Sequence, residues 1–218
     1  MTMLEKIGMG LKKVGIAAAI VAALGGGVPK ASAADGSVEF MTGHEVATLD
    51  LKVAEKLAPG MGLFVRGITS TSYDSGEVSP FCVVDISYDL GAGVGLVAEA
   101  QAAPGMGVVP RLGAQYFTEL GDVTIYALGT VKAMESPDGE VIVDVRYTPK
   151  VAEGVELLLG GEALTHFSEK GHDFSTQKLR AGVRLGEKYE VGAGVDLLET
   201  GKDGILDYSA GGFAGLKF

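Results

Sequence analysis

The sequence predicts an all-β fold, a closed up-and-down antiparallel barrel of twelve strands. From Ser37 onward the chain shows no helical period, and segments of roughly ten residues alternate between apolar and polar positions, as half-buried strands do. Turn residues separate these segments, and each segment is followed by one with which it can pair directly. The connections between them also alternate between short and longer ones. Together these observations predict a meander of antiparallel strands.

The twelve predicted strands are 37–42, 47–57, 62–72, 80–90, 94–102, 108–118, 122–133, 139–148, 154–166, 175–185, 189–199 and 205–218. The short connections are 58–61, 91–93, 119–121, 149–153 and 186–188, and the longer ones are 73–79, 103–107, 134–138, 167–174 and 200–204. The first strand is the weakest of the set. A barrel of ten strands is the alternative, if this segment stays unpaired and one later segment is not a strand.

The last predicted strand shows the alternation most clearly. Lys217 and Asp207 fall on one face, whereas the other face carries no charge and consists of Phe218, Leu216, Ala214, Gly212, Ala210, Tyr208 and Leu206. This strand resembles the closing strand of bacterial outer-membrane β-barrels, which also ends in an aromatic residue. The resemblance, which names no specific family, implies that the barrel assembly machinery recognises Phe218. Short turns at one end and longer loops at the other are also typical of these barrels, and they place the C-terminus at the periplasmic end.

Residues 1–33 have the features of a secretory signal peptide. Lysines precede the apolar run Ile16 to Leu24, and Ala31-Ser32-Ala33 is a small-residue cleavage site. The apolar run is too short for a membrane-spanning helix, which needs roughly 20 residues. We therefore expect Sec-type export with cleavage near Ala33, and a single barrel domain over residues 34–218.

Composition excludes several classes of function. The whole chain has a formal net charge of −10, and removal of residues 1–33, which hold four lysines and one glutamate, makes it three units more negative. Such an acidic product is not expected to bind nucleic acid. Cys82 is the one cysteine, so an intramolecular disulfide is impossible. The sequence suggests no cofactor.

Three features indicate that the apolar face meets lipid. The segments match the roughly 9 to 11 residues of a tilted membrane-crossing strand. Small residues on the apolar face would underfill a soluble core. Tyrosines on that face lie next to short turns and predict an interfacial girdle, made of Tyr88, Tyr116, Tyr147 and Tyr189. A secreted soluble β protein is the alternative.

The polar face then lines the lumen with eight acidic and nine basic residues. They are Asp50, Lys52, Arg66, Asp85, Glu99, Arg111, Lys132, Asp144, Arg146, Glu156, Glu162, Lys178, Arg180, Arg184, Glu190, Asp196 and Lys217. Opposite charges recur on neighbouring strands, where they can pair across the ladder. Inward glycines would open space, whereas inward residues such as Phe64 and Leu128 would reduce it. The charged wall can select the solutes that pass through a pore, or it can only stabilise the barrel through ion pairs.

These observations predict a small passive pore for ions or small polar solutes in the outer membrane of a diderm bacterium. Its partners would be outer-membrane lipid and the assembly machinery; the oligomeric state stays open. A non-conducting structural or anchoring barrel is the main alternative. Barrels of about eight strands are filled by side chains and those of 16 to 18 enclose channels, so twelve strands leave both possible.

An enzymatic alternative comes from one short motif. His166-Phe167-Ser168 resembles the His-x-Ser arrangement of outer-membrane lipid A deacylases, in which the histidine activates the serine hydroxyl. The strand alternation points His166 toward the lumen, so we expect no catalytic residues. His44 and His172 lack metal-site spacing, and we expect no bound metal.

Overall fold

A computed structural model describes residues 35–133, 138–201 and 204–218; the predicted signal peptide lies outside these residues. The chain forms a single antiparallel sheet. Its strands are β1 Asp35–Gly43, β2 Val46–Ala58, β3 Met61–Ser72, β4 Val78–Gly91, β5 Val94–Ala103, β6 Gly107–Leu120, β7 Val123–Lys132, β8 Gly139–Tyr147, β9 Lys150–Ala152, β10 Val155–Ser168, β11 Gly171–Leu185, β12 Tyr189–Thr200 and β13 Ile205–Lys217. None of the described residues forms a helix that is long and apolar enough to cross a membrane.

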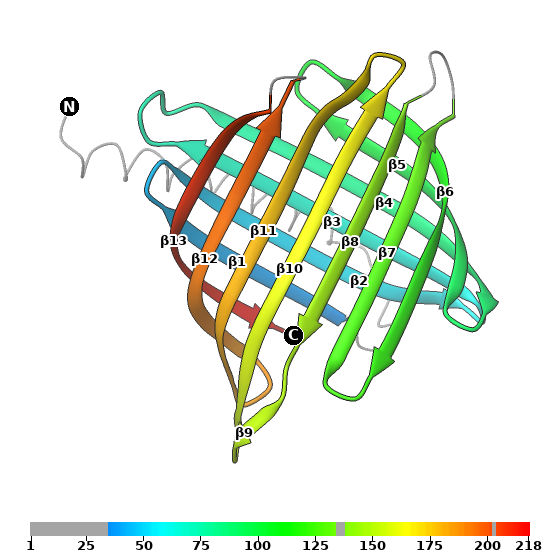
Figure 1. The fold of residues 1–218 in the computed structure, drawn as a ribbon. Coiled ribbons are helices and arrows are strands. Elements are labelled where there is room, and N and C mark those ends of the chain that lie inside the picture. The colour runs from blue at the N-terminus through cyan, green and yellow to red at the C-terminus, as the bar shows by residue number, and fades with distance from the viewer. Residues whose placement is uncertain (1–34, 134–137, 202–203) are drawn as a thin grey trace, which may run out of the picture.

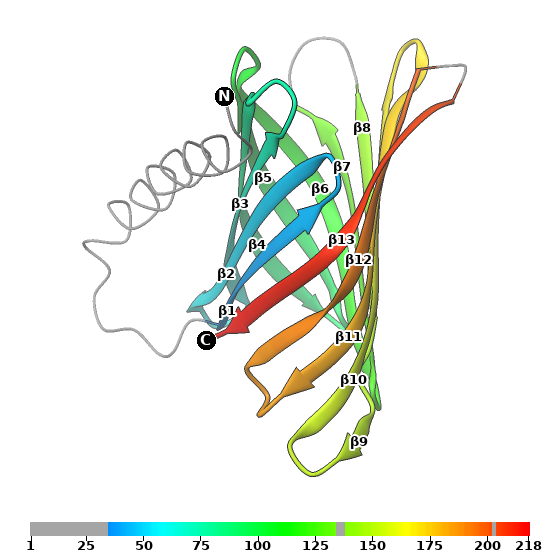
Figure 2. The same cartoon turned by 90° about the vertical axis from the view of Figure 1, so that its left-hand side faces the viewer.

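Twelve of these strands close into a ring, as predicted (Figure 1). Each strand of the ring pairs with the next along the chain, except that β8 skips β9 and pairs with β10, and β1 closes the ring by pairing with β13 from Ser37 opposite Lys217 to Gly43 opposite Gly211. Backbone hydrogen bonds in both directions between Gly36 and Phe218, of 2.8 and 2.9 Å, extend this seam. Figure 2 shows β13 running beside β1, so the weakest predicted strand is fully part of the barrel and the ten-strand alternative is wrong.

Two boundaries differ from the prediction. The predicted loop 167–174 is mostly strand, because β10 and β11 continue past His166 and are joined by the two-residue turn 169–170. Gly171, with a φ of 100°, allows this tight turn, and a bulge between His166 and Phe167 absorbs the extra residue. In addition, the predicted turn 149–153 contains the short strand β9, which pairs with β10 outside the ring.

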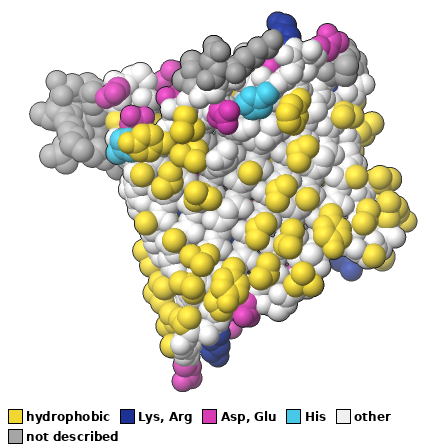
Figure 3. Space-filling view, in the orientation of Figure 1, with side chains coloured by type: hydrophobic (Ala, Val, Ile, Leu, Met, Phe, Trp, Pro, Cys, Tyr) yellow, Lys and Arg dark blue, Asp and Glu magenta, His cyan; other side chains and the backbone are white. Residues whose placement is uncertain are grey.

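Alternation along the strands separates an apolar outer surface from a polar interior. Figure 3 shows hydrophobic side chains spread over the outer face of the wall, with charged side chains at its two ends. Several large apolar side chains on this surface are exposed, among them Ile86, Leu96, Leu112, Val143, Leu179 and Val191. Such a large exposed apolar surface needs a nonaqueous partner.

Two glycines bring the backbones of β11 and β12 unusually close together. Gly182 and Gly192 are register partners. A Cβ added at Gly192 would meet the carbonyl oxygen of Ala181 and lie 2.6 Å from the Cα of Gly182. Because the obstructing atoms belong to the backbone, they cannot rotate away as a side chain would.

We expect Gly192→Ala to destabilise the barrel by roughly 1–3 kcal/mol, the usual range for overpacking. The matched control is Gly129→Ala, because a Cβ at Gly129 would have no atom within 4 Å. Urea unfolding in detergent, followed by loss of the heat-modifiable gel band, measures both variants. Equal unfolding midpoints for the two would contradict this account of the β11–β12 contact.

Candidate functional site

The interior holds the charged side chains that the alternation assigned to the lumen. Of the seventeen predicted residues, six are buried and the other eleven are half-buried. The buried six are Asp50, Arg66, Asp85, Glu99, Arg111 and Glu190. None of the seventeen is exposed on the outer surface. The site is therefore the barrel interior itself.

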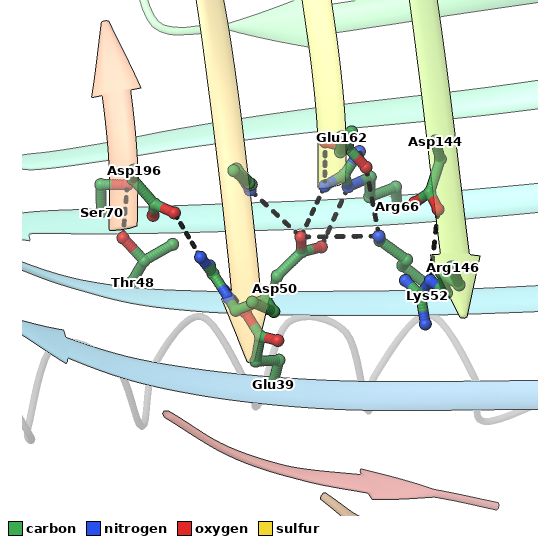
Figure 4. Close-up of polar contacts among 12 residues, drawn as sticks. Glu39, Thr48, Asp50, Lys52, Arg66, Ser70, Asp144, Arg146, Glu162 and Asp196 are labelled. Carbon is green, nitrogen blue, oxygen red and sulfur yellow. Dashed lines mark hydrogen bonds and ion pairs between the residues drawn. The ribbon is translucent and has the colours of Figure 1, made fainter. Parts of the chain in front are cut away.

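A cluster of ion pairs crosses this interior, and we call it the lumen bridge: Asp50, Lys52, Arg66, Glu162 and Lys178. The guanidinium of Arg66 donates to both carboxylate oxygens of Asp50, at 3.0 and 2.6 Å, and to both oxygens of Glu162, at 2.9 Å each. Arg66 stands on β3 and Glu162 on β10, which lie on opposite sides of the ring. Figure 4 shows Arg66 between the two carboxylates, linking the far wall to the near wall.

Two lysines complete the lumen bridge. Lys52 Nζ lies 3.3 Å from Glu162 and 4.0 Å from Asp50. Lys178 Nζ, from β11, donates to Asp50 at 3.2 Å. Each carboxylate thus has several cationic partners, which compensates the cost of placing it inside the barrel.

On one side of the lumen bridge the interior is filled. Met41, Leu158 and Phe213 form a buried apolar cluster. Arg180 donates to Glu39 at 2.9 Å and to Asp196 at 2.6 Å, and its guanidinium lies over the ring of Phe213. A small cavity of about 60 Å³ remains there.

The inward glycines of this side do not leave open space as predicted. A Cβ added at Gly194 would lie 2.8 Å from Nη1 of Arg180, so the arginine occupies the room that the glycine provides. Arg184 fills the adjoining region by donating to Glu156 and Glu190, at 2.9 Å each.

On the other side lies a cavity of about 1970 Å³, which we call the passage. Its lining residues extend from Gly60, Gly93 and Asp122 at the turn end to Met106 and Asp207 at the loop end. The wall includes predicted inward apolar residues such as Phe64 and Leu128. The lumen bridge forms one side of the passage, since Lys52, Arg66, Glu162 and Lys178 also line it. The lining residues of the passage therefore span the barrel from one end to the other.

A second polar network lines the passage opposite the lumen bridge. Gln101 Nε2 donates to Glu99 at 2.9 Å and to Glu140 at 3.0 Å. Arg111 lies 3.4 Å from Glu99, donates to Thr130 at 2.8 Å and reaches Asp138 at 2.5 Å. Hydrogen bonds thus connect β5 and β6 with β7 and the start of β8.

Sequence reasoning missed three acidic residues of the interior. Glu140 has the same parity as Asp144 and Arg146 in its strand, so the alternation could have identified it. Glu39 lies in the weakest predicted strand, whose facing was not assigned. Asp138 precedes β8 in a connection, where no periodicity applies.

The His-x-Ser motif lies at the loop end of β10, and His166 lines the passage. Both motif side chains contact Asp173: the Ser168 hydroxyl donates to Oδ1 at 3.0 Å, and His166 Nδ1 lies 3.1 Å from Oδ2. The serine proton is therefore directed at a carboxylate, whereas activation requires it to be directed at the histidine. Among the described residues, no group of three or more His, Cys, Asp and Glu side chains is placed to hold a metal ion.

The predicted aromatic residues of the girdle lie at one end of the barrel. Tyr88, Tyr116, Tyr147 and Tyr189 are all exposed and stand near the turns at the end where the chain stops. Phe218 is exposed at the same end.

No protein-family model matches the sequence, and no curated protein matches it. Its fold is similar to that of solved outer-membrane proteins. One is the NanC porin, with a TM-score of 0.52 and 11% identity over 85% of this chain and 99% of that chain. Another is the COG4313 outer membrane channel from Pseudomonas putida F1, with a TM-score of 0.50 and 12% identity over 88% of this chain and 97% of that chain. The chain therefore has the barrel fold of outer-membrane porins, without a specific family.

We expect the lumen bridge to contribute to the free energy of unfolding. Arg66→Ala leaves Asp50 and Glu162 without their shared partner, so we expect a loss of roughly 3 kcal/mol in the free energy of unfolding. Arg146→Ala is the control, because among the described residues its ion pair is the 3.3 Å contact with Asp144, and its side chain is 35% exposed. We expect the control to lose about 1 kcal/mol or less. Urea titration in detergent measures both, and similar losses would rule out a special role for the bridge.

Proposed function

We propose that this protein is a small passive pore of the outer membrane, open to ions or small polar solutes. The observation that supports this most directly is the passage, a cavity of about 1970 Å³ whose lining residues reach both ends of the barrel. Its wall carries charged and polar side chains that can replace part of the hydration of a solute. The barrel fold shared with porins agrees with this proposal.

The surface of the barrel supports the proposed membrane location. Every strand of the ring is paired on both edges, so the wall offers no unpaired edge to lipid. The apolar exterior and the tyrosines at the turn end fit a hydrocarbon layer and its interface. These features support the outer membrane of a diderm bacterium as the proposed location, and export with cleavage near Ala33 is part of the same proposal.

A non-conducting structural barrel is the second candidate. The lumen bridge favours it, because five charged side chains tie opposite walls together and one side of the interior is filled. Conductance separates the two candidates.

We expect purified protein in planar lipid bilayers to give stepwise single-channel currents. A cysteine in the passage, Ser87→Cys in a Cys82→Ala background, should give smaller steps after reaction with a bulky thiol reagent, because residue 87 lines the passage. The wild type is the matched control, since its single thiol, Cys82, is exposed and points away from the passage on the same strand. Folded protein without current steps would favour the structural barrel.

The aromatic terminus gives a further prediction. Phe218→Ala keeps the backbone hydrogen bonds to Gly36 but removes the side chain that we propose the assembly machinery recognises. We expect less of this variant in the outer membrane of a diderm host, measured by the heat-modifiable band, while its refolding in detergent stays normal. Tyr189→Ala, which removes another exposed aromatic side chain at the same end, should assemble normally. Equal outer-membrane amounts for the two variants would contradict a recognition role for Phe218.

A further inference from the structure

We infer that the passage prefers cations, and that Asp85, Glu99 and Glu140 set this preference. We call these three residues the acidic wall. The inference rests on the proposed pore function and adds to it a class of solute and the residues that select it.

The charge along the passage is unbalanced. Among the described residues that line it, fourteen are aspartates or glutamates and nine are lysines or arginines. Exposed carboxylates stand at both ends of the passage: Asp89, Glu119 and Asp122 at the turn end, and Glu45 and Asp207 at the loop end. A cleft with an excess of one sign of charge and low-dielectric walls raises the local concentration of the opposite ion. Both entrances therefore attract cations.

The acidic wall places this excess of charge inside the barrel. Asp85 and Glu99 are register partners on β4 and β5, so two carboxylates stand side by side. Like charges directly opposite each other on neighbouring strands repel. Glu140, from β8, joins them through Gln101, whose amide nitrogen donates to both glutamates. All three residues are at least 95% buried and line the passage.

The positive charges near the acidic wall are already engaged. Arg111 lies 3.4 Å from Glu99 but also contacts Asp138, and Lys132, the register partner of Arg111 on β7, is not free either. The bases of the lumen bridge are bound to Asp50 and Glu162.

Asp85 is the residue most affected by the lack of an available positive charge. Its Oδ1 is buried and accepts no hydrogen bond from the described residues. A buried carboxylate oxygen without a hydrogen-bond donor is costly, and its uncompensated charge adds to the negative potential beside the passage.

The experiment measures the reversal potential of wild-type channels in a planar bilayer across a KCl gradient. We expect the reversal potential to be shifted from zero toward the equilibrium potential of potassium. Asp85→Asn, which keeps the shape of the side chain, and separately Glu140→Gln should each shift it toward zero. The matched control is Glu153→Gln, which removes the same charge from an exposed residue that does not line the passage. We expect the control to keep the wild-type value. The heat-modifiable band shows that each variant is folded.

The outcomes separate the inference from the pore proposal. If wild-type channels conduct but their reversal potential is zero or shifted toward the equilibrium potential of chloride, the cation preference is wrong and the pore proposal stands. A cation preference that is unchanged in both Asp85→Asn and Glu140→Gln overturns the role of the acidic wall. Folded wild-type protein without any conductance overturns the pore proposal, and the inference falls with it.

Discussion

The pairing of β1 with β13 is the constraint on which the rest of the structure depends. An open twelve-stranded sheet would have two unpaired edges, and a sheet edge cannot be exposed to hydrocarbon because its backbone groups would lack partners. Once the ring is closed, every strand has one inward and one outward face, and the alternation of the sequence becomes a division between interior and surface. Closure also decides which distant strands face each other, and thereby brings Arg66 to Glu162.

The interior meets two opposing requirements by dividing its space. Charged side chains need partners, which favours filling the lumen with ion pairs, whereas a route for solutes needs free volume. In this barrel the ion pairs of Arg180 and the cluster around Phe213 occupy one side, Arg184 borders the passage, and the free volume is collected on the other side. The glycines of β11 and β12 make the filled side possible, because they let the arginine side chains and the backbones approach closely.

The sequence was sufficient to predict the strands and their facing, because a period of two residues is a local property that survives in any closed sheet. It also indicated that opposite charges on neighbouring strands can pair, as Arg66 does with Asp50 and Arg184 with Glu190, although it named no individual pair. The contact between Arg66 and Glu162 could not be predicted, because it depends on ring size and on the tilt of the strands. Predictions also failed where local rules are weak. The hairpin at Gly171 carries a bulge that shifts its register, and Asp138 lies in a connection without periodicity.

The lumen bridge also has a consequence for the order in which the barrel can form. Arg66 and Glu162 are 96 residues apart in the chain, and Asp50 and Lys178 are 128 apart. Hairpins form from sequence neighbours at a small entropic cost, whereas contacts of this span require the intervening chain to be in place. The early hairpin of β2 and β3 therefore already brings Asp50 and Arg66 together. Their partners Glu162 and Lys178 can contact them only after β10 and β11 have joined the sheet. The division of the lumen is a property of the finished barrel, absent from every shorter intermediate that lacks its last third.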